Sequence, residues 1–269
     1  MKQYLVTGGA GFIGSQIVRV LLDQGEAVRV LDNFSSGKRE NLEGFSSSKN
    51  GSRFEVVEGD VRDAFMVADA VRGVEIIFHE AAFVSVPESM EKPQDCFDVN
   101  ITGTSVLFEA ARMAGVRRAV IASSAAVYGD SDELPLKEDS PLRPLSPYAV
   151  SKCVDEMFAQ LYTSSFGFEV VALRYFNVYG PRQRPDSMYA AAVPISIRRL
   201  RDRRPITVFG DGGQTRDLMF VDIDREDLPF GRLASGLASM PPWRRCTVAR
   251  LREFSSARRK VRIPPSPPS

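Results

Sequence analysis

The chain has 269 residues, of which 43% are hydrophobic and 26% are charged, as is typical of globular proteins. Its formal net charge is +1, which favours neither nucleic acid nor a membrane as a partner. No run of 18 apolar residues is present, and a strand pattern begins at Gln3 without a basic and apolar leader. The three cysteines lack metal-ligand spacing, so we expect a cytoplasmic protein with reduced thiols and no metal site.

The charge is distributed unevenly along the sequence. Residues 225–269 contain ten Arg or Lys and three Asp or Glu, a net charge of +7, which leaves −6 for residues 1–224. The same segment has seven prolines and six serines and no sustained helical or strand period. We therefore expect residues 225–269 to form an anomalous, loosely packed tail. One hypothesis is that a shifted reading frame produced it.

Apolar runs of β type alternate with longer amphipathic stretches up to about residue 210. The sequence predicts strands at Gln3–Thr7, Ala27–Leu31, Phe54–Val57, Glu75–His79, Ala119–Ala122 and Glu169–Leu173. It predicts helices at Phe12–Gln24, Ala64–Val71, Asp98–Ala114, Tyr148–Phe166 and Ala190–Arg201. Strands rich in Val, Ile and Leu, with helices between them, indicate a parallel sheet covered on both faces. Right-handed crossovers make this a doubly wound α/β fold.

A glycine-rich turn, GGAGFIG at residues 8–14, lies between the first predicted strand and the first predicted helix. Glycine permits a tight turn whose backbone N–H groups approach a phosphate, and the helix N-terminus adds partial positive charge. Asp32 follows Gly14 by 18 residues, at the end of the second strand, as the dinucleotide fingerprint requires. A carboxylate there accepts hydrogen bonds from ribose hydroxyls and repels a 2′-phosphate. The motif therefore predicts NAD rather than NADP, a preference that Lys38 and Arg39 would weaken.

Three other features have a functional and a structural interpretation. Asp60 follows the third strand and is predicted to reach the adenine edge, or else to be a carboxylate at a helix N-terminus. His79, the only histidine, ends an apolar strand, and packing in the core is preferred over catalysis. An aromatic cluster is predicted to be mostly core; its members are Phe166, Phe168, Tyr175, Phe176 and Tyr179.

Tyr148 and Lys152 are four residues apart at the start of a long helical pattern, which places them on one helix face. A neighbouring ammonium group stabilises a phenolate, and a phenolate is a base that removes a hydroxyl proton. Ser124 lies just after the fifth predicted strand, where the carboxyl ends of parallel strands line a ligand crevice. Its hydroxyl is predicted to bind a substrate oxygen and the Tyr148 phenol. The alternatives are a surface Tyr–Lys pair and a serine that caps a turn.

These motifs resemble those of the extended short-chain dehydrogenases/reductases, in particular the 4-epimerases of UDP-glucose and UDP-N-acetylglucosamine. The matching stretches extend from residue 4 to about 222. They include TGGAGFIG (7–14), LDNFSSGKREN (31–41), GDVRD (59–63), SSAAVYGD (123–130), SPYAVSK (146–152), LRYFNVYGP (173–181) and GDGGQTRDLMFV (210–221). The resemblance implies a Rossmann fold with tightly held NAD, a UDP-sugar substrate and a homodimer formed through helices.

The resemblance also implies a domain organisation and a set of contacts. Residues 1–174 would form the NAD-binding domain, and residues 175–224 would begin a small, truncated substrate-binding lobe. The implied cofactor contacts are Gly8, Gly11, Phe12, Ile13, Gly14, Asp32, Asn33, Phe34, Ser35, Ser36, Gly37, Asp60, Val61, Ala81, Ala82, Asn100, Tyr148, Lys152 and Phe176. The implied substrate contacts are Ser85, Ser124, Tyr148, Asn177, Ala191 and Arg216, the last being a bidentate donor to diphosphate oxygens.

Ala125 and Ala126 directly follow Ser124. Related dehydratases resemble one another in carrying an Asp-Glu pair at these positions, and related UDP-glucuronate decarboxylases carry a Glu at the second. Because alanine is neither an acid nor a base, we predict epimerisation of a UDP-hexose at C4. In this hypothesis Tyr148 takes the 4-hydroxyl proton, a hydride moves to NAD, and it returns to the opposite face of a 4-keto sugar. A catalytically impaired NAD-binding relic and a UDP-uronic acid epimerase or decarboxylase remain as alternatives.

Overall fold

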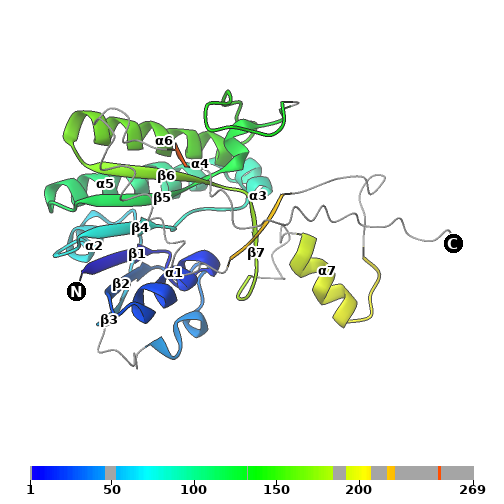
Figure 1. Ribbon diagram of the computed structural model, residues 1–269, viewed down its shortest axis with the longest axis horizontal. Helices are drawn as coiled ribbons and strands as arrows, with labels where there is room; N and C mark the ends of the chain where they lie inside the picture. The colour runs from blue at the N-terminus through cyan, green and yellow to red at the C-terminus, as the bar shows by residue number, and fades with distance from the viewer. Residues whose placement is uncertain are drawn as a thin grey trace.

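The computed structural model describes residues 2–45, 53–131, 133–183, 192–206, 217–221 and 248–249. A parallel sheet lies at its centre, with the strand order β3-β2-β1-β4-β5-β6 continued by the two-residue β9 (Figure 1). The strands are β1 (Gln3–Thr7), β2 (Ala27–Asp32), β3 (Phe54–Glu58), β4 (Ile76–His79), β5 (Arg118–Ser124), β6 (Glu169–Tyr175) and β9 (Val248–Ala249). The prediction of a doubly wound α/β fold of the Rossmann type is confirmed.

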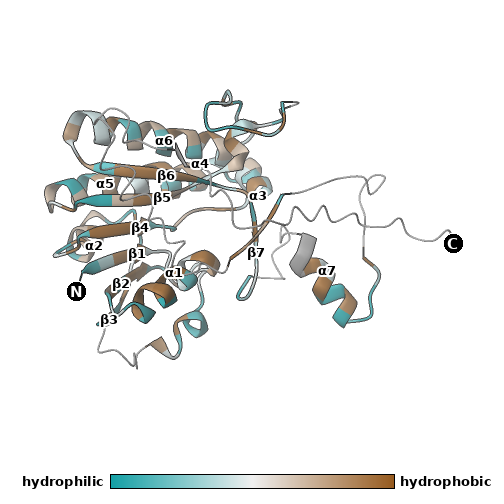
Figure 2. Cartoon of the chain, in the orientation of Figure 1, coloured by the Kyte–Doolittle hydropathy of each residue, from teal (hydrophilic) through white to brown (hydrophobic). Residues whose placement is uncertain are grey.

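Helices cover both faces of this sheet because side chains alternate between the faces along each strand. Leu5 of β1 packs in the cluster under α2 (Ala64–Ala70), α5 (Gly103–Met113) and α6 (Pro147–Phe166). Its neighbours Tyr4 and Val6 pack in the second cluster, against α1 (Phe12–Asp23). Figure 2 shows the result as brown strands between helices that carry both colours.

The structure corrects several predicted boundaries. β2, β5 and β6 each end one or two residues later than predicted, so Asp32, Ser124 and Tyr175 are the last residues of their strands. The helix predicted from Asp98 to Ala114 begins as a turn of π-helix, Asp98–Thr102, before α5 starts. Two short helices, α3 (Val86–Glu91) and α4 (Pro93–Phe97), were not predicted, because the sequence there shows no sustained period.

Beyond β6, a second sheet of two parallel strands forms from β7 (Asn177–Tyr179) and β8 (Leu218–Phe220). The helix α7 (Ala192–Arg201) stands apart from the main sheet in Figure 1. Of the tail predicted to be anomalous, only Val248–Ala249 is described, as the strand beside β6. In the described ranges, no helix is long and apolar enough to cross a membrane.

Candidate functional site

The glycine turn after β1 is so tight that side chains would not fit. Gly8 has φ +66°, and a Cβ on it would lie 2.6 Å from the backbone nitrogen of Ala81. A Cβ on Gly14 would lie 2.3 Å from the carbonyl oxygen of Gly8. α1 begins after Gly11, with no side-chain cap and no acidic residue in its first turn. Its positive end therefore keeps the field that attracts a phosphate group.

Asp32 is buried at the end of β2, with 6% of its surface exposed. One carboxylate oxygen accepts the N–H of Ala10 at 2.9 Å, and the other accepts the N–H of Phe34 at 2.8 Å. Burial raises the pKa of Asp32, and these two hydrogen bonds oppose the rise. Each oxygen has a further acceptor position, which a ribose hydroxyl would fit. Gly37 approaches so closely that a Cβ on it would lie 2.9 Å from both oxygens.

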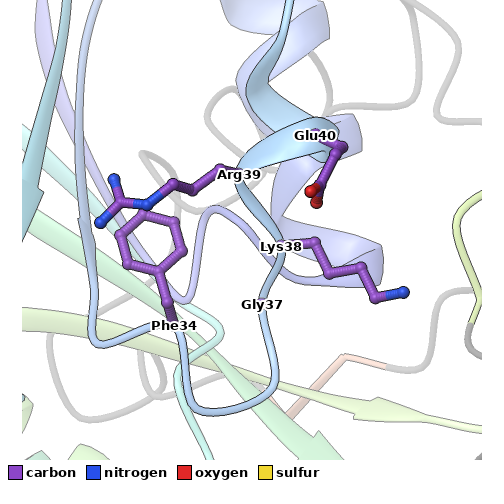
Figure 3. A pocket seen from close by; sticks show the side chains of 5 residues that line it. All are labelled: Phe34, Gly37, Lys38, Arg39 and Glu40. Carbon is purple, nitrogen blue, oxygen red and sulfur yellow. The ribbon is translucent and has the colours of Figure 1, made fainter.

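An open hollow of about 480 Å³ lies on this loop, lined by Phe34, Gly37, Lys38, Arg39 and Glu40 (Figure 3). The Arg39 guanidinium lies over the Phe34 ring, 4.2 Å from its centroid, and pairs with Glu58. Lys38 points away from this stack in Figure 3. Because Glu58 already engages Arg39, the attraction of Arg39 for a 2′-phosphate is reduced, which favours NAD.

Asp60 lies beside this loop and accepts a hydrogen bond from Asn33 at 2.8 Å. Arg62 forms two side-chain hydrogen bonds to its carboxylate, at 2.8 and 2.7 Å, and holds the pKa of Asp60 well below its usual range. The alternative role of Asp60 at a helix N-terminus is wrong. Asp63 caps α2 instead, because its carboxylate accepts two backbone N–H groups of the first turn.

Other residues predicted to contact the cofactor lie near Asp32 and Asp60, around the same edge of the sheet. The N–H of Ser35 donates to the side-chain oxygen of Asn33 at 3.0 Å, which shapes the loop after β2. Val61 is buried after β3. Phe12 and Ile13 form the first turn of α1, and Ser36 follows Ser35 in the loop.

His79 at the end of β4 is buried between two threonine hydroxyls. Its Nδ1 is 2.7 Å from Oγ1 of Thr7, and its Nε2 is 3.0 Å from Oγ1 of Thr104. Burial and, to a smaller extent, the charge of Lys152 lower the pKa of His79 to about 3. The imidazole is therefore neutral and packed, as predicted.

Glu80, the next residue, carries a carboxyl group that the sequence analysis missed. The hydroxyl of Tyr175 donates to it at 2.9 Å, which joins the ends of β4 and β6. Burial raises the pKa of Glu80 to about 7, although Tyr175 and Lys152 oppose the rise. A Cβ on Gly8 would lie 2.8 Å from the carbonyl carbon of Glu80. Glu80 therefore lies at the glycine turn.

Asn100 fixes the connection between β4 and α3. Its side chain accepts the N–H of Phe83 at 2.7 Å and donates to the Phe83 carbonyl at 3.1 Å. It also donates to the hydroxyl of Ser151 on α6 at 2.8 Å. Three predicted site residues lie on the connection that Asn100 holds: Ala81, Ala82 and Ser85. In the structure Ser85 caps α3.

The start of α6 carries two of the residues predicted to be catalytic, Tyr148 and Lys152. The N–H of Tyr148 donates to the Ser89 hydroxyl at 3.2 Å, and the Tyr148 side chain is half-buried. Lys152 is 4% exposed, and its Nζ donates to Asp155 at 3.1 Å. Burial lowers the pKa of Lys152, but Asp155, Tyr148 and Glu80 outweigh it, so the pKa is raised. Lys152 therefore interacts with both Tyr148 and the glycine-turn edge of the sheet.

Ser124 ends β5 and accepts the N–H of Ala126 at 3.1 Å, as the cap of a 3₁₀ turn at Ala125–Tyr128. The capping alternative is therefore observed, but the hydroxyl proton remains available to donate. Phe176 packs against Val127, Tyr128 and Cys153. The prediction that Phe166 is core is wrong, because 52% of its surface is exposed at the end of α6.

Of the predicted substrate residues beyond β6, only Asn177 is described. Its side chain donates to the carbonyl oxygen of Asp217 at 3.1 Å, which ties β7 to the chain before β8. Ala191 and Arg216 lie outside the described residues.

A buried ion pair, also missed from the sequence, fastens α6 to β6. Arg174 donates to both carboxylate oxygens of Glu156, at 2.8 and 2.7 Å, and to the Tyr128 hydroxyl at 2.8 Å. Ser123 donates to the same carboxylate at 2.6 Å. This network holds the helix that carries Tyr148 and Lys152 against the ends of the strands.

The sequence matches the model of the NAD dependent epimerase/dehydratase family over residues 4–222. The chain belongs to this family. It is 43% identical, over 220 residues, to a UDP-glucose 4-epimerase of Mycolicibacterium smegmatis, a match that covers 81% of this chain and 69% of that protein.

Two solved members of the family share the fold. A UDP-N-acetylglucosamine 4-epimerase from Methanobrevibacter ruminantium, in complex with UDP-N-acetylmuramic acid, superposes with a TM-score of 0.78 at 38% identity. That match covers 84% of this chain and 71% of that one. A Thermus thermophilus UDP-glucose 4-epimerase in complex with NAD gives a TM-score of 0.74 at 40% identity, over 89% and 75% of the two chains.

The family is NAD-dependent, and the residues of this chain fit the cofactor. Side chains at Gly8 and Gly14 would collide with neighbouring backbone, so backbone N–H groups could approach a pyrophosphate there. Asp32 retains acceptor positions for a ribose. Across the described residues, no group of three or more His, Cys, Asp or Glu could hold a metal ion.

Proposed function

We propose that this chain is an NAD-dependent 4-epimerase of a UDP-hexose. The observation that carries the proposal is the place of Lys152, which is buried beside Tyr148 and interacts with Glu80 at the glycine turn. The ammonium group of Lys152 in this position would interact with both the Tyr148 phenol and a bound dinucleotide. The UDP-sugar epimerases similar to this chain support the substrate class.

Residues that end or follow several strands of the sheet would hold the cofactor. The glycine turn would bind the pyrophosphate, Asp32 the adenosine ribose, and Asp60 the adenine edge, while Phe176 would flank the nicotinamide. When bound, NAD supplies a hydride acceptor that can also return the hydride, so no net oxidation results. NAD rather than NADP follows from the buried carboxylate of Asp32 and from the pairing of Arg39 with Glu58.

Three side chains would act on the sugar. Tyr148 removes the proton from the 4-hydroxyl and later returns it to the 4-keto sugar. Lys152 supplies positive charge that stabilises the phenolate and donates to the nicotinamide ribose. Ser124, whose oxygen already accepts the N–H of Ala126, uses its proton to orient the sugar oxygen. Asn177 and Arg216 would bind the diphosphate.

The pair Ala125–Ala126 favours epimerisation within this family. These residues form the turn that begins at Ser124, and neither methyl group can donate or accept a proton. Elimination of water or loss of carbon dioxide therefore receives no acid or base from these two positions. A reversible oxidation at C4 needs only the base that Tyr148 provides.

Incubation of the purified chain with UDP-glucose, UDP-N-acetylglucosamine and UDP-glucuronate separately, followed by proton NMR of the products, tests the proposal. We expect 4-epimers of the neutral hexoses, with NAD retained through purification. Conversion of UDP-glucuronate alone would establish the uronic acid alternative. Retained NAD with no conversion of any substrate would establish an impaired NAD-binding protein.

A homodimer formed through helices belongs to the same proposal. Several apolar side chains on α5 and α6 are exposed: Met113, Val150, Met157, Leu161 and Phe166. Exposed apolar residues that gather on neighbouring helices mark a protein interface. Light scattering after gel filtration should give twice the monomer mass, and the Leu161→Lys variant should lower it toward that of the monomer.

A further inference from the structure

Asp155 is a buried carboxyl group for which the proposed reaction has no use. It lies three residues after Lys152 on α6, and its side chain is 2% exposed. Lys152 donates to it at 3.1 Å and is itself only 4% exposed. A surface pair at this spacing contributes little, whereas a buried one must compensate the loss of water around both charges.

Without a partner, Lys152 would have difficulty remaining an ammonium in this position. Full burial of a lysine favours its neutral form. Apart from Asp155, the groups that interact with Lys152 are Tyr148 from its own helix, His79 at the end of β4, Glu80 directly after it, and Cys96 from α4. His79 is neutral, Cys96 has a pKa raised by burial, and Glu80 is about half ionised at pH 7.

Asp155 is therefore the partner that contributes most to the charge of Lys152. Its interaction is the largest of those that raise the pKa of Lys152, and its hydrogen bond adds to it. Burial in turn raises the pKa of Asp155, which Lys152 and the hydroxyl of Thr104 oppose; Glu156, next on α6, adds to the rise. Both side chains emerge from one helix three residues apart, so the backbone keeps the two groups within reach of each other.

We infer that Asp155 is a positioning residue of the site, whose carboxylate fixes the nitrogen of Lys152 and keeps it an ammonium ion. Asp155 acts through Lys152 and touches neither the sugar nor the cofactor. Its catalytic consequence rests on the proposed function, because a neutral Lys152 would no longer stabilise the phenolate of Tyr148. Its electrostatic effect on Lys152 does not rest on that function.

The charge of Lys152 is measurable in the full-length chain without any assay of turnover. In protein labelled with ¹³C-lysine, the Cε resonance reports the charge of each amine, and the Lys152→Met variant identifies the resonance of Lys152. We expect the Asp155→Asn variant to lower the titration midpoint of Lys152 by at least about one pH unit, because burial is then opposed less. The exposed Asp69→Asn variant should leave it unchanged. An unchanged midpoint in Asp155→Asn would overturn the inference.

Two further variants separate positioning from simple structural support. Should Asp155→Asn fail to fold, Asp155→Ser removes the same charge from a smaller side chain and is measured in the same way. Asp155→Glu keeps the charge and should bring the titration midpoint of Lys152 most of the way back to the parental value. If the chain is an epimerase, the alkaline limit of its pH–rate profile should move down in Asp155→Asn and back in Asp155→Glu. A chain without epimerase activity still gives the NMR result, so the two proposals fail separately.

Discussion

The two ends of the site are held in different ways. At the end proposed to hold the adenosine, Asp32 accepts the backbone N–H groups of Ala10, in the turn after β1, and of Phe34, two residues along the chain. At the catalytic end, α6 is fixed by side-chain ion pairs, Lys152 with Asp155 and Glu156 with Arg174. The first arrangement depends on glycines and one carboxylate, the second on buried charges.

This difference determines how each end responds to substitution. The glycine turn and its loop lose their conformation when a side chain replaces a glycine hydrogen, or when the Asp32 carboxylate that accepts the backbone N–H groups is lost. A buried ion pair fails when either partner is removed, since the remaining charge has no water around it. Substitutions at the catalytic end should therefore cost more stability than those at the adenosine end.

The largest effect is expected for Arg174→Met. It leaves the buried carboxylate of Glu156 without its bidentate partner, which should lower the free energy of unfolding by about 3–5 kcal/mol. Arg72→Met, which breaks an exposed pair with Asp69, should cost at most about 0.5 kcal/mol. Urea unfolding measures both. Similar losses in the two variants would contradict the claim that burial makes the ion pair of α6 costly to break.

Gly14→Ala tests the backbone-built end. Its Cβ would collide with the Gly8 carbonyl, so we expect a loss of about 2–3 kcal/mol of stability and a protein that no longer retains NAD through purification. Gly73→Ala serves as the control, because Gly73 has φ +71° but nothing within 4 Å of the added Cβ. It should cost about 1 kcal/mol and leave NAD bound. Wild-type NAD content in Gly14→Ala would contradict the tight turn.

Glu80 predicts a pH dependence of stability. Its pKa rises from 4.5 in the unfolded chain to about 7, so the folded chain holds a proton that the unfolded chain has lost. The stability that Glu80 contributes in its protonated form is therefore fully present below pH 4.5 and is lost as the pH rises through about 7. Glu80→Gln should be more stable than the parent above pH 7, by about 1–2 kcal/mol since part of the residue still meets solvent, and equal near pH 4.5. Thermal unfolding at several pH values measures this; parallel curves would refute it.

The smallest effect is expected for Asp32→Asn, and the quantity that changes is the affinity for NAD. An amide has one acceptor oxygen where the carboxylate has two, so one of the two backbone N–H groups loses its acceptor. A ribose hydroxyl would also lose a hydrogen bond to a charged group. Calorimetry should show NAD binding weakened about tenfold. Glu40→Gln, which neutralises an exposed carboxylate on the same loop, should leave the affinity unchanged. Equal affinities in all three proteins would exclude Asp32 from the cofactor site.

The sequence was sufficient for features with a local signal. The six strands of the core and the glycine turn follow from periodicity and chain order, and Asp32 follows from its distance to Gly14. The missed features depend on distant partners. Asp155 occupies an ordinary polar position of a helix until the fold buries it. Glu80 acquires its raised pKa only when the fold buries it, and its hydrogen-bond partner Tyr175 lies 95 positions later in the chain.

The helices and aromatic residues show the same limit. α3 and α4 are too short for a period to be visible, and prolines near their starts read as loop. Phe166 follows the aromatic pattern of its neighbours, yet α6 ends there and leaves the ring exposed. Hydrophobicity predicts which residues prefer burial, but only the packing decides which of them obtain it.

The central claim concerns the phenol of Tyr148, and one comparison tests it most directly. The Tyr148→Phe variant keeps the ring and loses only the oxygen, while Tyr162→Phe changes another tyrosine of the same helix, whose hydroxyl reaches Glu109. With UDP-galactose as substrate, Tyr148→Phe should lose at least about a hundredfold in rate while it retains NAD, and Tyr162→Phe should keep the parental rate. Undiminished formation of UDP-glucose by Tyr148→Phe would contradict the account.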